Sequence, residues 1–272
     1  MNKRKLHRAW TQIKLKSRRI ETMADNKYPV PEAAAARSLI TEDEYRSMYQ
    51  TSIDDPEGFW SEQGQRIDWF KPYNKVKNTS FEKDQVSIRW FEDGTLNACY
   101  NCVDRHLEKR GDQVALIWEG DDASNKKTIT YRQLYENVCR FANVLKSRGI
   151  GKGDVVTIYM PMIPEAIYAM LACARIGAPH SVIFAGFSPE AIAGRIEACN
   201  SKAVITADEN RRGGRVFPLK ASVDEALETH GISTVDTVIV VKCTGSDVDW
   251  KPERDIWYQE AAAEVSDECP VE

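Results

Sequence analysis

The chain has 272 residues, 42% of them hydrophobic and 29% charged, which is enough to form the core of one large or two modest domains. Its formal net charge of −4 argues against a general nucleic-acid-binding protein, and no uncharged apolar run has the length of a membrane span. We therefore expect a globular cytoplasmic protein, without nucleic acid or a membrane among its partners.

The charge is unevenly distributed. Residues 1–22 contain eight Lys or Arg and a single acid, Glu21, so this segment is strongly basic and the remainder is acidic. An organelle-targeting peptide has this composition, but a solvated basic extension, or an upstream start before Met23, is the simpler interpretation. We expect residues 1–37 to form a poorly ordered extension.

The next segment, residues 38–110, is predicted to be a mostly helical and irregular arm. Thr41 and Glu44 have the spacing of a capping box, so a helix should begin there and run to about Ile53. A second helix should begin at Pro56, and residues 61–81 are predicted to be irregular. A half-buried strand is expected at residues 86–90, followed by a helix from Asn97 to about residue 111.

From residue 111 to residue 272 strands and helices alternate, which is typical of an α/β fold with a mostly parallel sheet flanked by helices. The predicted strands are residues 114–118, 128–130, 155–160, 181–184, 203–207 and 237–241. The predicted helices begin near Thr130, Pro164, Pro189 and Ala221. Residues 243–272 are polar and predict no further element.

Two loops leave the carboxyl ends of predicted strands, where open α/β sheets bind ligands. One comprises residues 184–187, and the other comprises residues 208–218, with three arginines around two glycines. Arginine offers a planar fork to phosphate oxygens, and glycine lets the backbone approach a ligand closely. This pattern favours a nucleotide-bearing phosphate ligand, although a solvated arginine-rich turn explains the spacing equally simply.

The remaining candidates predict little chemistry. The seven cysteines are an odd, scattered set, which indicates free thiols in a reducing compartment. Cys99 and Cys102 form a lone C-x-x-C near His106, and core packing on one helix face explains them as well as a metal does. His180 is predicted to be a core histidine, and residues 149–154 a turn before a strand.

At several points the chain resembles AMP-forming acetyl-coenzyme A synthetases, in order and spacing from about residue 28 onward. The matching segments are residues 58–60, 69–72, 90–97, 101–106, 159–165, 177–182, 184–190, 206–209 and 212–215. They are specific for the acetyl- and propionyl-CoA synthetase branch of the adenylate-forming enzymes. The resemblance assigns residues 38–110 to the N-terminal cap of these synthetases and residues 111–272 to the first part of their AMP-dependent synthetase/ligase domain.

The resemblance also implies a reaction and a set of binding residues. Acetate and ATP give acetyl-adenylate and pyrophosphate, and coenzyme A then displaces AMP. The residues implied to bind coenzyme A are Arg212, Gly213, Gly214, Arg215, Phe184 and Gly186. Ala185 stands where the family has a glycine, so close backbone approach is less expected at that point. No catalytic residue and no metal ligand is assigned.

The family's phosphate loop, acetate pocket and catalytic lysine would follow residue 272, so we expect this chain to be an N-terminal portion that is inactive alone. No cofactor should bind tightly, whereas the full-length enzymes use ATP, coenzyme A and magnesium. The open alternatives are a non-catalytic coenzyme A- or nucleotide-binding module, one half of a split synthetase completed by a second chain, and a propionate–CoA ligase. Self-association through exposed apolar surface is also expected.

Overall fold

The computed structural model describes residues 28–272, which fall into two compact units, one ending at Gly64 and the other spanning Gln65–Glu272. The sequence-based predictions for the basic head and for Met23 lie outside the described residues. The domain boundaries at residues 37 and 110 stay predictions.

The first unit is helical, with α2 (Glu32–Ala35), α3 (Glu42–Asp54) and α4 (Pro56–Gly64). The predicted capping box is confirmed, because Thr41 Oγ1 accepts the backbone N–H of Glu44 at 3.3 Å while the Thr41 N–H donates to the Glu44 carboxylate at 2.7 Å. Helix α2 lies in the segment predicted to be poorly ordered. Its three alanines have the highest helix propensity of all residues.

The second unit begins with an antiparallel hairpin of β1 (Lys75–Ser80) and β2 (Ser87–Glu92). Strand β2 confirms the prediction, but β1 lies in the segment predicted to be irregular. Its sequence has no apolar alternation, and only pairing with β2 makes it a strand. The predicted half-burial of β2 is also wrong, since Ile88 and Trp90 are both exposed.

The helix expected from Asn97 to residue 111 is broken into three pieces: α5 (Ala98–Cys102), η1 (Asp104–His106) and α6 (Leu107–Arg110). The break falls at Val103, whose backbone leaves the helical region with φ −127°. The predicted cap is confirmed, because Asn97 Oδ1 accepts the Tyr100 N–H at 3.1 Å.

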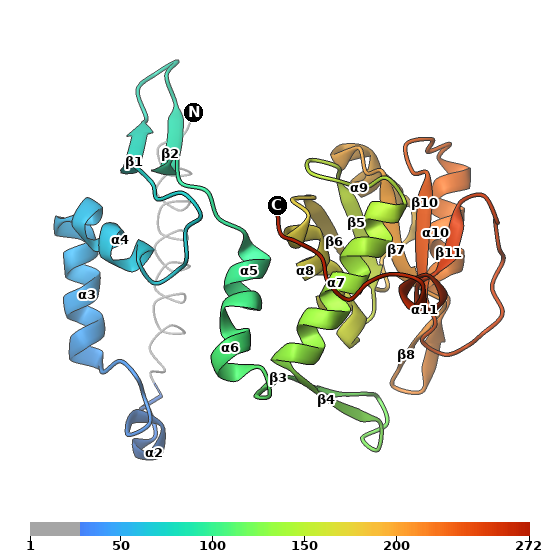
Figure 1. Cartoon of the computed structure of the whole chain (residues 1–272), viewed down its shortest axis with the longest axis horizontal. Coiled ribbons are helices and arrows are strands. Elements are labelled where there is room, and N and C mark those ends of the chain that lie inside the picture. Colours follow the sequence, from blue (N-terminus) through green and yellow to red (C-terminus); the bar gives the residue numbers. More distant parts are fainter. Residues whose placement is uncertain (1–27) are drawn as a thin grey trace, which may run out of the picture. The chain divides into compact units, whose positions relative to one another are not determined.

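Five parallel strands form the main sheet of the second unit, in the order β11-β10-β7-β5-β6 (Figure 1). Their bounds are β5 (Val156–Met160), β6 (His180–Phe184), β7 (Ala203–Ala207), β10 (Thr237–Val241) and β11 (Asp255–Trp257). The three central strands, β5, β7 and β10, are buried along their whole length, as continuous apolar runs in a parallel sheet predict. This confirms the predicted α/β fold class.

Helices cover the sheet in two groups. Their bounds are α7 (Tyr131–Ser147), α8 (Pro164–Arg175), α9 (Pro189–Cys199), α10 (Leu219–Thr229) and α11 (Tyr258–Ala263). Helix α7 packs against α8 and α11, whereas α9 packs against α10. The connections β5-α8-β6, β6-α9-β7 and β7-α10-β10 are the crossovers that parallel strands require.

The predicted helix starts agree with the structure. Thr130 and Gln133 form the capping box of α7, Pro164 occupies the first turn of α8, and Ser188 caps α9. The prediction for residues 243–272 is wrong, because β11 and α11 lie there. Strand β11 has three residues and depends on pairing with β10, so it has no periodicity of its own.

Two further antiparallel hairpins lie outside the main sheet: β3 (Val114–Glu119) with β4 (Lys126–Thr130), and β8 (Asn210–Arg212) with β9 (Arg215–Phe217). Figure 1 shows both at the lower end of the sheet, the first in green and the second in orange. In residues 28–272 no helix is both long and apolar enough to cross a membrane.

Candidate functional site

The first predicted loop follows β6, which forms one edge of the sheet. Gly186 adopts φ +120°, a region that residues with a side chain rarely enter. The loop is held by the buried Tyr159 of β5, whose hydroxyl accepts the Gly186 N–H at 3.0 Å and donates to the Phe187 carbonyl at 3.1 Å. Phe184 is 60% exposed, so its ring faces solvent rather than the core.

The second predicted loop follows β7 and forms the β8–β9 hairpin. Arg212 and Arg215 are paired across this hairpin, and Gly213 and Gly214 make its two-residue turn. Both glycines have positive φ, 57° and 72°, as a tight turn between twisted strands requires. All four residues are exposed, so the hairpin presents two guanidinium groups and a turn to solvent.

The two loops meet at one point. The Arg212 guanidinium carbon lies 6.0 Å from the centroid of the Phe184 ring, which is within the range of a cation–π interaction. The structure therefore brings Phe184 and Arg212 together from segments that are separate in the sequence. Gly186 is not part of this contact, and its N–H donates to the Tyr159 hydroxyl.

The base of the second loop is fixed by a buried carboxylate, Asp208, at the end of β7. Its oxygens accept the N–H groups of Cys243 at 2.8 Å and Gly245 at 2.7 Å, and also bond to Thr244, in the segment that follows β10. These bonds tie together the carboxyl ends of two neighbouring strands. They satisfy a charge that would be costly to bury alone.

The topology places both loops where an α/β sheet binds ligands. The chain leaves β5 to form β6 on one side and then returns to form β7 on the other side of β5. Ligands of open α/β sheets bind outside the carboxyl ends of the strands at such a reversal of strand order. Phe184 ends β6, and the hairpin follows β7, so the loops flank this point.

The sequence did not predict the roles of two polar residues, Tyr159 and Asp208. Tyr159 was expected in a buried apolar strand and at the start of a segment resembling the synthetases, but nothing in the sequence indicates that its hydroxyl bonds to a loop. Asp208 was recognised as the start of a loop but not as its anchor. An acidic residue directly after a buried strand could have indicated this anchor, because a buried carboxylate needs hydrogen-bond donors around it.

The cysteine pair does not form one chemical site in this structure. Cys99 is buried and accepts a hydrogen bond from Arg175 at 3.5 Å, whereas Cys102 is exposed. Burial raises the pKa of the Cys99 thiol to about 12, which disfavours the thiolate needed for metal binding. Across the part of the chain that the structure describes, no group of three His, Cys, Asp or Glu side chains could hold a metal ion.

The other two candidates have structural positions. His180 is exposed at the start of the edge strand β6, so the prediction of a core histidine is wrong. Within residues 28–272, β6 pairs with β5 alone, so His180 lies on an edge strand, which its neighbours cover less than they cover the central strands. Residues 149–154 form the predicted turn before β5, with the Gly151 N–H donating to Asp154 at 2.9 Å.

Comparison with protein families identifies the family of the chain. The model of the AMP-binding enzyme family matches residues 103–270, which include the sheet and both loops. The chain belongs to the AMP-binding enzyme family. The preceding residues of the chain, 45–102, match the family described as the acetyl-coenzyme A synthetase N-terminus.

The chain is also similar to curated proteins named acetyl-coenzyme A synthetase. It is 59% identical over 247 residues to that of Sodalis glossinidius, covering 91% of this chain and 38% of the relative. Over 250 residues it is 61% identical to that of Parvibaculum lavamentivorans, covering 92% of this chain and 38% of the relative. It is 60% identical over 245 residues to that of Vibrio cholerae, covering 90% of this chain and 38% of the relative.

These comparisons confirm the predicted resemblance to acetyl-coenzyme A synthetases. The chain spans about two fifths of the length of the curated relatives it matches, since 38% of each is covered.

Proposed function

We propose that the protein is an AMP-forming acetate–CoA ligase, which converts ATP, acetate and coenzyme A into AMP, pyrophosphate and acetyl-CoA through acetyl-adenylate. Identity of about 60% to proteins named acetyl-coenzyme A synthetase supports this proposal, as does the match of the AMP-binding enzyme family. The cytoplasm is its proposed location, which cell fractionation with an antibody to the chain would test.

Within that reaction the described residues contribute a surface for the nucleotide end of coenzyme A. The supporting observation is the 6.0 Å approach of Arg212 to the Phe184 ring, which joins the two glycine-containing loops at the carboxyl end of the sheet. Arg212 and Arg215 offer guanidinium forks to phosphate oxygens. The apolar ring of Phe184 lies beside them and can pack against a nucleotide base.

Calorimetric titration of the 272-residue chain with coenzyme A tests this surface. Arg212→Ala and Arg215→Ala are each expected to weaken binding by about tenfold or more, because charge-assisted hydrogen bonds contribute about 1.5–3 kcal/mol. Arg89→Ala is the matched control, since Arg89 is an exposed arginine on β2. Unchanged affinity in both loop variants would remove the hairpin from the binding site.

The 272 residues alone are expected not to complete the reaction. Adenylyl transfer needs preorganised groups aimed at the reacting phosphate, and the described side chains include no metal-binding cluster for magnesium. Acetate-dependent exchange of pyrophosphate into ATP by the purified chain would contradict this expectation.

A binding module without catalysis is the second candidate, and a synthetase split over two chains is the third. The experiment adds, as a second chain, the segments of the relatives that this chain does not cover. Coenzyme A binding without any gain of activity after this addition would favour the module. Recovery of exchange activity when those segments are supplied as a second chain would favour the split enzyme. A propionate–CoA ligase is distinguished by comparing kcat/KM for acetate and propionate in the completed enzyme.

A further inference from the structure

The Gly213–Gly214 turn, which lies between Arg212 and Arg215, is hydrogen-bonded to a carboxylate from the β3–β4 hairpin. Asp121, in the loop between β3 and β4, accepts the Gly213 N–H at 2.9 Å and the Gly214 N–H at 3.3 Å. These donors lower the pKa of Asp121, so the carboxylate stays ionised over the physiological range. One acidic side chain therefore binds both amides at the tip of the β8–β9 hairpin.

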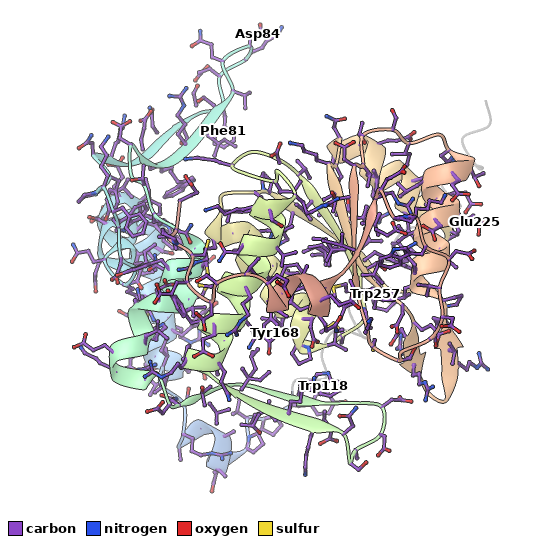
Figure 2. All side chains as sticks on the ribbon, turned by 45° about the vertical axis from the view of Figure 1, so that its right-hand side comes forward. Phe81, Asp84, Trp118, Tyr168, Glu225 and Trp257 are labelled. Carbon is purple, nitrogen blue, oxygen red and sulfur yellow. The ribbon has the colours of Figure 1, made fainter. Side chains whose placement is uncertain are left out.

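The β3–β4 hairpin is itself fixed to the main body of the second unit. Trp118 of β3, labelled in Figure 2, donates its indole N–H to the Met162 carbonyl at 2.7 Å, in the loop that follows β5. Lys127 of β4 lies 5.6 Å from the Trp118 ring centroid and 3.8 Å from the Glu165 carboxylate, in the first turn of α8. The hairpin thus spans from the loop after β5 to the loop after β7.

This arrangement limits the motion of a hairpin that lies outside the main sheet. Strands β8 and β9 have three residues each and pair only with one another in the described chain. A two-stranded hairpin is marginally stable in water without further support. Two hydrogen bonds at its tip reduce the conformational entropy that Arg212 and Arg215 would otherwise lose when a ligand binds.

We infer that Asp121 is a positioning residue, which holds the Gly213–Gly214 turn in place so that Arg212 and Arg215 are preorganised for the phosphates of coenzyme A. The identity of the ligand in this inference rests on the proposed function. The hydrogen bonds between Asp121 and the turn are independent of that function. Asp121 acts through the hairpin and need not touch the ligand.

Trypsin cleavage after Arg212 and Arg215 measures the grip without any ligand. Asp121→Ala is expected to speed cleavage at these sites by about two- to tenfold, the range set by losing one or two hydrogen bonds. Asp121→Asn retains one acceptor oxygen and can keep one of the two hydrogen bonds, so its rate should lie between those of the original chain and Asp121→Ala. Asp122→Ala is the matched control, because Asp122 accepts its hydrogen bonds from Ser124. Unchanged cleavage of Asp121→Ala would overturn the inference.

Titration with coenzyme A then measures the consequence for binding. Asp121→Ala should weaken the affinity by about two- to tenfold, and Asp121→Asn, which keeps one acceptor oxygen, should restore part of it. Tighter binding by both variants would show that Asp121 competes with the ligand, which also overturns the inference. If the unaltered chain does not bind coenzyme A, the proposed function fails, while the cleavage rates still decide whether Asp121 holds the turn.

Discussion

Arg175 and Asp104 form a two-point ion pair that joins α8 to η1. The guanidinium nitrogens of Arg175 lie 2.8 and 2.9 Å from the two carboxylate oxygens of Asp104. Burial by itself would lower the pKa of Arg175, but the hydrogen bonds to Asp104 raise it above its usual value. Arg175 also donates to the Cys269 carbonyl at 2.5 Å, so the pair anchors the last described segment of the chain.

Removing Asp104 should therefore destabilise the second unit severely. Asp104→Ala leaves a guanidinium whose side chain is 2% exposed without its carboxylate, and breaking such a pair costs about 3–5 kcal/mol. Urea unfolding followed by circular dichroism measures the loss. Asp112→Ala is the control, because the Asp112 side chain is 95% exposed and should change the free energy of unfolding little. Equal stability of the two variants would contradict the prediction.

Acid should weaken a second buried charge cluster. Lys220 lies 2.7 Å from Asp224 and 2.8 Å from Asp255, and Arg254 also contacts both carboxylates. Burial opposes ionisation of Asp255, but hydrogen bonds from Arg254 and Lys220 outweigh it, and the pKa of Asp255 is lowered.

A carboxylate with a lowered folded-state pKa stabilises the protein above its unfolded pKa, and this contribution is lost as pH falls through the folded value. The free energy of unfolding should thus decrease on acidification below about pH 5. In Asp255→Asn the neutral amide cannot titrate, so this decrease should be shallower, although the variant is less stable at pH 7. Parallel curves for the two proteins would contradict the assignment to Asp255.

Phe184 and Arg212 should act as a unit in ligand binding. If the ring helps to orient the guanidinium, Phe184→Leu and Arg212→Ala will show a coupling of about 0.5–1 kcal/mol in a double-mutant cycle on coenzyme A affinity. Phe187→Leu is the comparison, because its ring lies 4.8 Å from the Arg195 guanidinium carbon instead. Additive effects of the first pair would show that the 6.0 Å approach has no energetic consequence.

The cysteines should divide into two classes of reactivity. Burial raises the pKa of Cys99 and of Cys173 to about 12, so both are almost entirely protonated at pH 8. Cys102 is exposed and should be labelled rapidly by a disulfide reagent such as Ellman's reagent. Peptide mass spectrometry identifies the labelled thiols, and in guanidinium chloride all seven cysteines should react. Fast labelling of Cys99 in the folded chain would contradict its burial.

The open edge of the sheet should promote association of the isolated chain. Within residues 28–272, β6 pairs with β5 alone, and Val182 on it is 56% exposed. Unpaired edge strands with apolar side chains invite pairing with another chain. Sedimentation velocity should show concentration-dependent association, which Val182→Lys reduces. Val216→Lys, on the β9 hairpin strand, is the control for added charge. A monomer at all concentrations would contradict the prediction.

Local chemistry determined much of the second unit. The caps at Asn97, Thr130 and Ser188 involve hydrogen bonds within three residues, so their spacing is visible in the sequence. Strands β5, β7 and β10 were predicted because an apolar run between turn residues fits a sheet covered on both faces. The two loops of the candidate site followed from the ends of such strands.

What the tertiary structure alone decided are the pairings between distant segments. Strand β6 is apolar from Val182 to Phe184, like parts of its buried neighbours, yet it lies at the edge because no further strand of the described chain pairs with it. The approach of Arg212 to Phe184 and the grip of Asp121 on the Gly213–Gly214 turn join segments with no shared periodicity. The spacing of apolar side chains and of capping residues depends on residues within about one turn of each other in the sequence. These contacts depend instead on how whole helices and strands pack.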